Sequence, residues 1–172
     1  MNYDIYHSSI TYFPLLPLSK TASFECKVLD IRQMPAQVLF PHWDDEFEFI
    51  YVLSGMMEFR VRQKAFLVSS GEGFFLNTGE IHSACAYQSY DCRFVIYRIC
   101  PSVLFQTEDN PLYQKYIKPM VDHPSFGFLT FVPKVPWQKY ILEMIRKMND
   151  ICERPVDGYE LKINHFINEI FY

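Results

Sequence analysis

The sequence predicts a mainly β protein, a sandwich or barrel, that ends in a pair of α-helices. Short apolar runs separated by turn residues follow one another from Ser23 to Ile99, which is typical of a sandwich or barrel and not of a βαβ fold. From residue 136 onward, apolar residues instead recur at steps of three and four, the period of an amphipathic helix. The length of 172 residues fits one domain.

Three parts can be distinguished along the chain. Residues 1–20 are expected to form an N-terminal arm, because Pro14 and Pro17 block a helix and the many aromatic side chains would be costly to expose. We expect residues 21–133 to form the barrel and residues 134–172 to form the helix pair.

The barrel strands are expected where apolar or alternating runs lie between turn signals. The predicted strands are Ser23–Gln33, Ala36–Phe40, Glu46–Leu53, Met57–Arg62, Ala65–Val68, Gly73–Leu76, His82–Tyr87, Cys92–Ile99 and Gly127–Val132. Ser54-Gly55 predicts a turn between the third and fourth of these strands. Short helical turns are expected at Ser102–Gln106 and Pro111–Ile117.

Two amphipathic helices are expected at the end of the chain. The first runs from about Pro136 to Glu153, and the second begins at Tyr159 after the interruption at Asp157-Gly158. Because the second helix has no stop signal before Tyr172, we expect the native protein to continue further. The first helix carries a long apolar stripe made of Ile141, Met144, Ile145, Met148 and Ile151. Packing on the barrel is its ordinary explanation, but the stripe is long for a helix with charged flanks. We expect it to pack also against its copy in a second chain, which would bury what the barrel leaves exposed.

Composition excludes several classes of function. The net charge is −4 and no run of Lys or Arg occurs, so the chain by itself should not bind nucleic acid. The five cysteines form no CxxC pair, which argues against a zinc ribbon or a disulfide framework. No signal peptide or membrane-spanning stretch is evident, and we expect a cytoplasmic protein with no membrane partner.

The densest chemistry lies at residues 41–55, where polar side chains precede an apolar strand. In an extended segment His42, Asp44 and Glu48 would point to one face, so one wall of a cavity would carry an imidazole and two carboxylates. Glu46 has the same parity, but four such groups would repel one another. We therefore expect a bulge between Asp44 and Phe47 that places Glu46 outside the pocket.

A second motif at residues 71–82 combines with the first to resemble the two-part pattern of the cupin superfamily. The first cupin motif is filled by His42, Asp44, Glu48 and Gly55, and the second by Gly71, Asn77, Gly79 and His82. Two positions depart from the pattern, because Asp44 replaces a histidine and Asn77 replaces a proline. The resemblance implies a double-stranded β-helix, or jelly-roll barrel, followed by a pair of antiparallel α-helices.

The wider pattern resembles the N-terminal effector-binding and dimerisation domain of AraC-type transcription regulators. Residues 46–55 (EFEFIYVLSG) and 157–162 (DGYELK) look much like the corresponding phrases of that family. The resemblance implies a small-molecule effector, often a sugar, held in the barrel with the arm closing over it. It also implies a homodimer through the C-terminal helices, DNA contact only through a helix-turn-helix domain absent from this chain, and no catalysis.

The same residues allow three interpretations. As groups that bind a polyol effector, the candidates are His42, Asp44, Glu48, Phe75, Asn77, His82 and Tyr97, with Phe94 and Arg98 as further wall residues from strand parity or position. Alternatively, the polar groups satisfy one another inside a small barrel. In the third interpretation His42, Asp44, Glu48 and His82 bind iron, manganese, nickel or zinc in a stand-alone cupin enzyme, an isomerase or dioxygenase. We expect a sensor without a cofactor.

Overall fold

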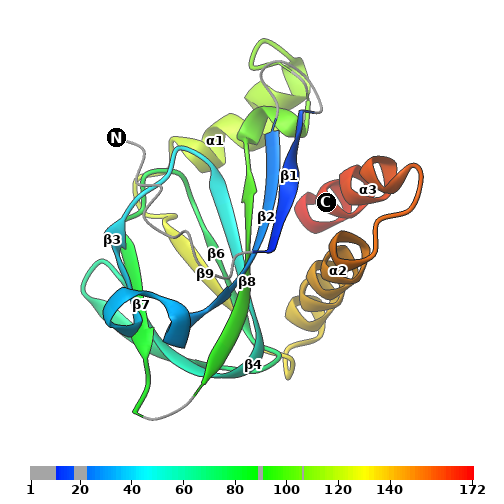
Figure 1. Cartoon of the computed structure of the whole chain (residues 1–172). Helices are drawn as coiled ribbons and strands as arrows, with labels where there is room; N and C mark the ends of the chain where they lie inside the picture. Colours follow the sequence, from blue (N-terminus) through cyan, green and yellow to red (C-terminus); the bar gives the residue numbers. More distant parts are fainter. Residues whose placement is uncertain (1–10, 18–22, 89–90, 106) are drawn as a thin grey trace.

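The chain folds into a β-barrel with two helices packed against one side (Figure 1). The computed structural model describes residues 11–17, 23–88, 91–105 and 107–172. The predicted fold class, a jelly-roll barrel followed by an antiparallel helix pair, is confirmed. Much of the predicted arm, residues 1–10 and 18–20, lies outside the described residues, while Thr11–Pro17 forms a strand paired with the barrel.

The strands of the described residues form two connected halves of a barrel. Their bounds are β1 Thr11–Pro17, β2 Ser23–Asp30, β3 Val38–His42, β4 Phe47–Val61, β5 Lys64–Ser69, β6 Gly73–Leu76, β7 His82–Ala86, β8 Cys92–Ile99 and β9 Phe128–Phe131. One half has the order β1-β2-β8-β4-β6-β9, and the other pairs β3 with β7 and pairs β7 and β5 with β4. Strand β4 therefore belongs to both halves.

The predicted turn at Ser54-Gly55 is wrong, because β4 continues through it as one long strand. The register with β8 shifts between Val52 and Ser54, and Gly55 adopts a positive φ of 80°. This β-bulge bends the strand and changes its side-chain parity. Even-numbered Val52 and odd-numbered Phe59 consequently both belong to the same apolar cluster inside the barrel.

The long helices begin where they were predicted, but two short helical turns replace the end of the predicted strand Ser23–Gln33 and the start of the predicted strand Ala36–Phe40. The Asp30 side chain accepts a hydrogen bond from the backbone of Arg32 at the first of these turns, and Pro35 begins the second. Short turns are η1 Ile31–Gln33, η2 Pro35–Gln37, η3 Pro101–Val103, the π-helical η4 Tyr113–Ile117 and α1 Lys118–Val121, and the long helices are α2 Pro136–Glu153 and α3 Tyr159–Phe171. Position 106, the end of one predicted helical turn, lies outside the described residues. No helix in the described ranges combines the length and apolarity needed to cross a membrane.

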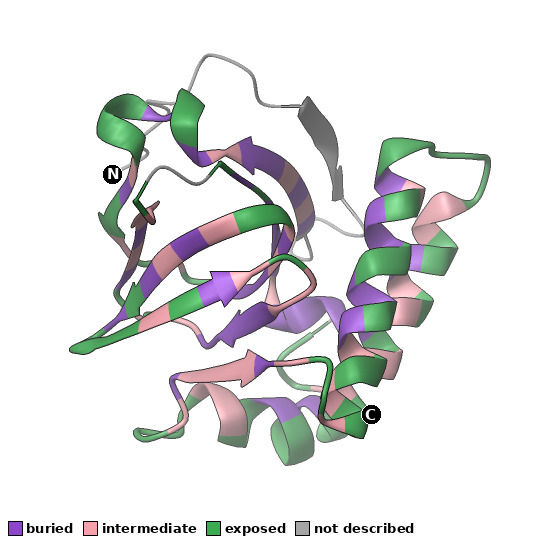
Figure 2. Ribbon diagram, turned by 90° about the horizontal axis from the view of Figure 1, so that it is seen from below, coloured by how far each residue is buried: buried purple, intermediate pink, exposed green. Residues whose placement is uncertain are grey.

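Two apolar clusters lie on opposite sides of the strands. The inner cluster fills the barrel and includes Ile50, Phe74 and Phe94. The outer cluster joins the strands to α2 and α3, and it buries Ile145 and Met148 of the predicted helix stripe. Figure 2 shows that the buried side of the two long helices faces the barrel. This part of the stripe therefore packs on the barrel within one chain and is not a free surface. Because helices cover one half from outside, its strands are apolar on both faces.

Candidate functional site

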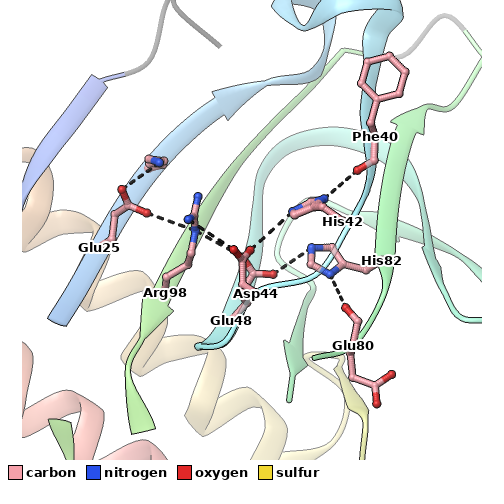
Figure 3. A network of polar contacts seen from close by, with 9 residues as sticks. Glu25, Phe40, His42, Asp44, Glu48, Glu80, His82 and Arg98 are labelled. Atoms are coloured by element: carbon pink, nitrogen blue, oxygen red, sulfur yellow. Dashed lines mark hydrogen bonds and ion pairs between the residues drawn. The ribbon is translucent and has the colours of Figure 1, made fainter. Parts of the chain in front are cut away.

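A cluster of ionisable side chains lies beside the apolar interior of the barrel (Figure 3). Its members are Glu25, His42, Asp44, Glu48, His82 and Arg98. Four of them, His42, Asp44, Glu48 and His82, were predicted from the two sequence motifs, and the structure brings all four together.

Cross-strand pairing explains how residues far apart in sequence meet. Arg98 on β8 lies opposite Glu25 on β2 and also opposite Glu48 on β4. His42 on β3 lies opposite His82 on β7. Residues directly opposite one another in a sheet point to the same face, so these pairings direct the charged groups and imidazoles into one region.

The chain between β3 and β4 differs from the predicted single extended segment with a bulge. Strand β3 ends at His42, the chain bends at Asp45 and Glu46, and β4 begins at Phe47. The bend separates two strands with different partners, which lets the imidazole and the carboxylate approach the site from different directions. Glu46 lies on the bend, as predicted.

Both imidazoles are oriented by backbone carbonyl groups. His42 Nδ1 lies 2.7 Å from the carbonyl oxygen of Phe40, and His82 Nδ1 lies 2.9 Å from that of Glu80. A carbonyl only accepts, so each Nδ1 carries the proton and donates it. The ring centroids are 4.2 Å apart. In the neutral form of either ring, Nε2 can therefore accept a hydrogen bond or bind a cation.

Glu48 and His82 form the most deeply buried pair of the cluster. Their Oε2 and Nε2 atoms are 2.9 Å apart, and their side chains are 2% and 1% exposed. Burial opposes charge on both groups, but their contact outweighs it: the pKa of His82 lies above its ordinary value and the pKa of Glu48 lies below. For His42, burial and the neighbouring His82 lower the pKa.

Arg98 is surrounded by three carboxylates. Its Nε atom lies 3.2 Å from Glu25 and 3.6 Å from Glu48, and its NH1 atom lies 3.7 Å from Asp44. Burial and the Glu48 carboxylate raise the pKa of Asp44 above its ordinary value. Glu25 is also paired with the Nζ atom of Lys27 at 2.9 Å, so the three carboxylates are shared between two cationic side chains.

Several buried polar atoms of the cluster have no hydrogen-bond partner among the described residues. They are Asp44 Oδ2, both carboxylate oxygens of Glu48, His82 Nε2 and Arg98 Nε. The Glu48–His82 contact is thus close but not aligned as a hydrogen bond. Ion-pair contacts such as that between Glu48 and His82 compensate part of their burial, and the remaining hydrogen-bonding capacity is available to a ligand.

A metal ion fits three of the four residues predicted for it. Ligand atoms of His42, Glu48 and His82 all lie within 4.8 Å of one another. Asp44 is not part of this group, although its Oδ2 lies 3.8 Å from His42 Nε2. The unpartnered Nε2 and carboxylate atoms form a mixed nitrogen and oxygen donor set that suits a divalent transition ion.

Two residues predicted for the pocket wall point away from it. Phe75 and Tyr97 belong to the outer cluster: Phe75 contacts Phe171 of α3, and the hydroxyl of Tyr97 donates to the carbonyl of Ile145 in α2 at 3.2 Å. Strand alternation places them on the face opposite the barrel interior. Phe94 and Arg98, the other two wall candidates, do lie on the inner side.

Asn77 has a structural position instead of the predicted place in the pocket. Its Nδ2 atom donates to the carbonyls of Met120 and Phe126, both at 2.7 Å, and its Oδ1 accepts from the backbone of Thr78 at 2.9 Å. The amide at the proline position of the cupin pattern thus ties the loop after β6 to the segment before β9.

Sequence reasoning missed Glu25, which lies opposite Arg98 in the cluster. The alternation of polar and apolar residues in its strand indicated only that Glu25 lies on the polar face.

Comparison with known proteins identifies the family. Residues 27–160 match the family model of the AraC-like ligand binding domain. The HTH-type transcriptional regulator YdeC of Bacillus subtilis (strain 168) is 28% identical over 122 residues, covering 71% of this chain and 41% of that protein. This chain thus spans less than half the length of that relative.

Solved structures agree on the fold. Unsaturated fatty acid bound wild-type ToxT from Vibrio cholerae strain SCE256 aligns with a TM-score of 0.55 and 11% identity over 88% of this chain and 52% of that chain. An apo ToxT variant from the same strain gives a TM-score of 0.53 and 9% identity over 85% and 53% of the two chains. The family model described above matches well over half of the residues of this chain, and the chain therefore belongs to the AraC-like ligand binding domain family.

Proposed function

We propose that this chain is the effector-sensing and dimerisation part of a cytoplasmic AraC-type transcription regulator and not an enzyme. The observation that carries the proposal is the buried cluster of unpartnered polar atoms inside the barrel. An effector that binds them would be the regulator's input. DNA would be contacted only by a helix-turn-helix domain outside this chain, as the relationship to an HTH-type regulator suggests.

The strands that carry the cluster also contact the helices, one residue away. Glu48 faces the site, while its neighbours Phe47 and Phe49 contact Phe171 of α3 with ring centroids 5.4 and 5.8 Å apart. Arg98 faces the site on β8, where the preceding residue hydrogen-bonds to α2. A ligand that shifts β4 or β8 would therefore reposition the helix pair.

The chemistry of the cluster favours a polyhydroxylated effector such as a sugar. Most of its unpartnered atoms are acceptors, and hydroxyl groups can donate to them. The unpartnered carboxylate oxygens of Asp44 and Glu48 disfavour a free fatty acid, the ligand named for ToxT, because its anionic head group would meet acceptors. Entry is easiest beside His42 and Arg98, whose side chains are 32% and 30% exposed.

The helix pair offers an exposed surface for a second copy of the chain. Trp137, Tyr140 and Leu161 are exposed apolar residues on α2 and α3. They replace the predicted stripe as the candidate dimer contacts, because central members of that stripe are buried against the barrel. A homodimer would bury this apolar surface.

A thermal unfolding screen of the purified chain tests the sensing proposal. The panel contains pentoses, hexoses and inositols, with an unsaturated fatty acid as the competing class. A ligand that binds only the native state at 100 times its Kd stabilises it by about 2.7 kcal/mol, so an effector should give a saturable rise in Tm. Two variants of β4 are compared, Glu48→Gln in the cluster and Glu58→Gln as its matched control. Glu58 faces outward and forms an ion pair with Arg60.

The variants decide where the effector binds. Glu48→Gln should abolish the rise in Tm, whereas Glu58→Gln should retain it. A polyol that stabilises wild type and Glu48→Gln equally would place its site elsewhere. A response to the fatty acid alone would overturn the polyhydroxylated class, and no response to either class would leave the sensing proposal without a ligand.

A further inference from the structure

We propose that Cys26 and Cys152 form a reversible disulfide when a peroxide oxidises the reduced chain, and that this bond fastens helix α2 to strand β2. Both residues are buried, and both thiols are free in the structure. They belong to the outer apolar cluster and not to the group of ionisable residues proposed to bind an effector. The reaction therefore does not require an effector.

Strand pairing places Cys26 beneath helix α2. Cys26 on β2 lies directly opposite Tyr97 on β8, so both side chains point to the same face of the sheet. This is the outer face, because the Tyr97 hydroxyl donates to the carbonyl of Ile145 in α2 at 3.2 Å. The Cys26 thiol is in hydrogen-bond contact with the same hydroxyl. Cys26 thus faces the helix and not the barrel interior.

Helical spacing brings Cys152 to the same place. Cys152 lies seven residues after Ile145 in α2, which is close to two full turns at 3.6 residues per turn. Both residues therefore lie on the face of α2 that packs on the strands, beside the half of the barrel that contains β2 and β8 (Figure 1). There the thiols of Cys26 and Cys152 share a hydrogen bond.

Contact between the two thiols meets the main geometric requirement for a disulfide. The side chains of a bridged pair must point toward each other at short range, because otherwise the backbone has to move. Cys26 and Cys152 also lie near opposite ends of the chain, so a bond between them closes a long loop. Cross-links of this kind constrain the unfolded chain most strongly.

A peroxide such as hydrogen peroxide is a two-electron oxidant small enough to enter a packed interface. One cysteine, as its thiolate, attacks a peroxide oxygen: an S–O bond forms, the O–O bond breaks, and hydroxide leaves and takes up the released proton. The second thiol attacks the resulting sulfenic acid, so that the S–S bond forms and the S–O bond breaks with loss of water. In total two thiols lose two electrons and two protons, and one peroxide becomes two molecules of water.

Burial determines how fast the pair reacts. The hydrogen bond with Cys152 and burial raise the pKa of the Cys26 thiol well above its ordinary value, so little thiolate is present in the closed structure. We therefore expect oxidation to proceed when α2 separates transiently from the strands, at a rate that urea below the unfolding transition increases. A pair of this kind stays reduced at rest and is oxidised under sustained exposure to peroxide, as is typical of the transient disulfides of reducing compartments.

The position of the bond gives it a regulatory consequence, which rests on the proposed function. Cys26 directly follows Glu25, which contacts Arg98 in the ionisable cluster. Helix α2 belongs to the helix pair that an effector is proposed to reposition. A bond between β2 and α2 restricts that movement, so oxidation would reduce the response of the helix pair to the effector.

Peroxide treatment followed by peptide mapping tests the bond. The reduced chain is treated with hydrogen peroxide in buffer and in urea just below the unfolding transition, then unfolded, blocked with a thiol reagent and digested with trypsin. We expect the number of free thiols to fall from five to three, and peptides 21–27 and 148–162 to appear as one linked species that dithiothreitol separates. Absence of this species under both conditions, or a link through another cysteine instead, overturns the proposal.

Hydrogen exchange tests whether the bond fastens the helix. Amide hydrogens in the last turns of α2 should exchange at least about tenfold more slowly in the oxidised chain, because the bond opposes local opening. Addition of dithiothreitol should restore the original rate. Unchanged exchange in a fully linked chain would refute the claim that the disulfide holds α2 against β2.

Single variants assign the bond to the two residues. Cys26→Ala and Cys152→Ala should each abolish the linked species, whereas Cys92→Ala, a matched control that is buried in the inner cluster, should retain it. Persistence of the link in either of the first two variants contradicts the assignment. Circular dichroism and cooperative unfolding check that each variant folds, and serine replaces alanine at any position where the alanine variant does not.

The peptide map needs no effector, so it separates this proposal from the sensing proposal. A linked pair in a chain that responds to no sugar keeps the disulfide and removes support from the sensor. A sugar response in a chain that forms no linked pair refutes the disulfide and keeps the sensor.

Discussion

Replacing Gly55 by alanine is expected to be far more damaging than replacing Gly71, although both have nearly the same backbone conformation. Gly55 has a φ of 80° and Gly71 a φ of 85°. A Cβ atom added at Gly55 would lie 1.5 Å from the backbone oxygen of Asp91 and 2.5 Å from its carbonyl carbon, whereas a Cβ at Gly71 meets nothing within 4 Å.

The two substitutions share one energetic cost and differ in another. Alanine in the left-handed region costs about 1–2 kcal/mol at either position. Gly55→Ala must also displace the backbone of Asp91, whose oxygen accepts a hydrogen bond from Met56 at 3.2 Å. Overpacking of this kind adds about 1–3 kcal/mol, which gives a total of about 2–5 kcal/mol. Folded domains are stable by only about 5–15 kcal/mol, so Gly55→Ala removes a large part of that stability.

Urea unfolding followed by circular dichroism measures the difference directly. Gly71→Ala should lower the free energy of unfolding by no more than about 2 kcal/mol, and Gly55→Ala should lower it further or prevent folding. Since the bulge at Gly55 sets the parity of β4, a folded Gly55→Ala should also disturb the interior beside Glu48. Equal costs for the two variants would refute the reasoning that the close approach to Asp91 requires glycine.

Three further predictions follow from contacts described above. Asn77→Ala removes two hydrogen bonds to backbone carbonyls and should lower the free energy of unfolding by about 2–3 kcal/mol; a cost below about 0.5 kcal/mol, typical of a surface site, would contradict its role. Tyr97→Phe loses the bond to the carbonyl of Ile145 and the contact of the hydroxyl with the Cys26 thiol, so a cost of about 1 kcal/mol is expected in the same assay. Effector binding by Tyr97→Phe should be unchanged. A loss of effector binding would show instead that Tyr97 contributes to the pocket. Leu161, 77% exposed on α3, is expected to contact the second copy, so Leu161→Glu should raise the dimer dissociation constant at least about tenfold in analytical ultracentrifugation. Lys162→Glu controls for added charge, and equal effects of the two would argue against an apolar contact at this position.

Much of the fold could be predicted because local pattern and tertiary structure agree. The bounds of β6, β8 and α2 are those that hydrophobic periodicity and turn residues predict. One exception is β4, where Ser54-Gly55 was interpreted as a turn. A glycine at positive φ suits a turn and a bulge equally well. Pairing with β8, which no local sequence reveals, selects the bulge.

The site was predictable only where spacing between motifs carried the information. His42, Glu48 and His82 follow from that spacing, but strand parity could not decide which face of β6 or β8 is interior. Because helices cover the outer face, both faces of these strands are apolar. The prediction therefore placed Phe75 and Tyr97 on the inner face, whereas they lie on the outer one. Glu25 escaped notice because a charged residue that alternates with apolar ones ordinarily faces solvent.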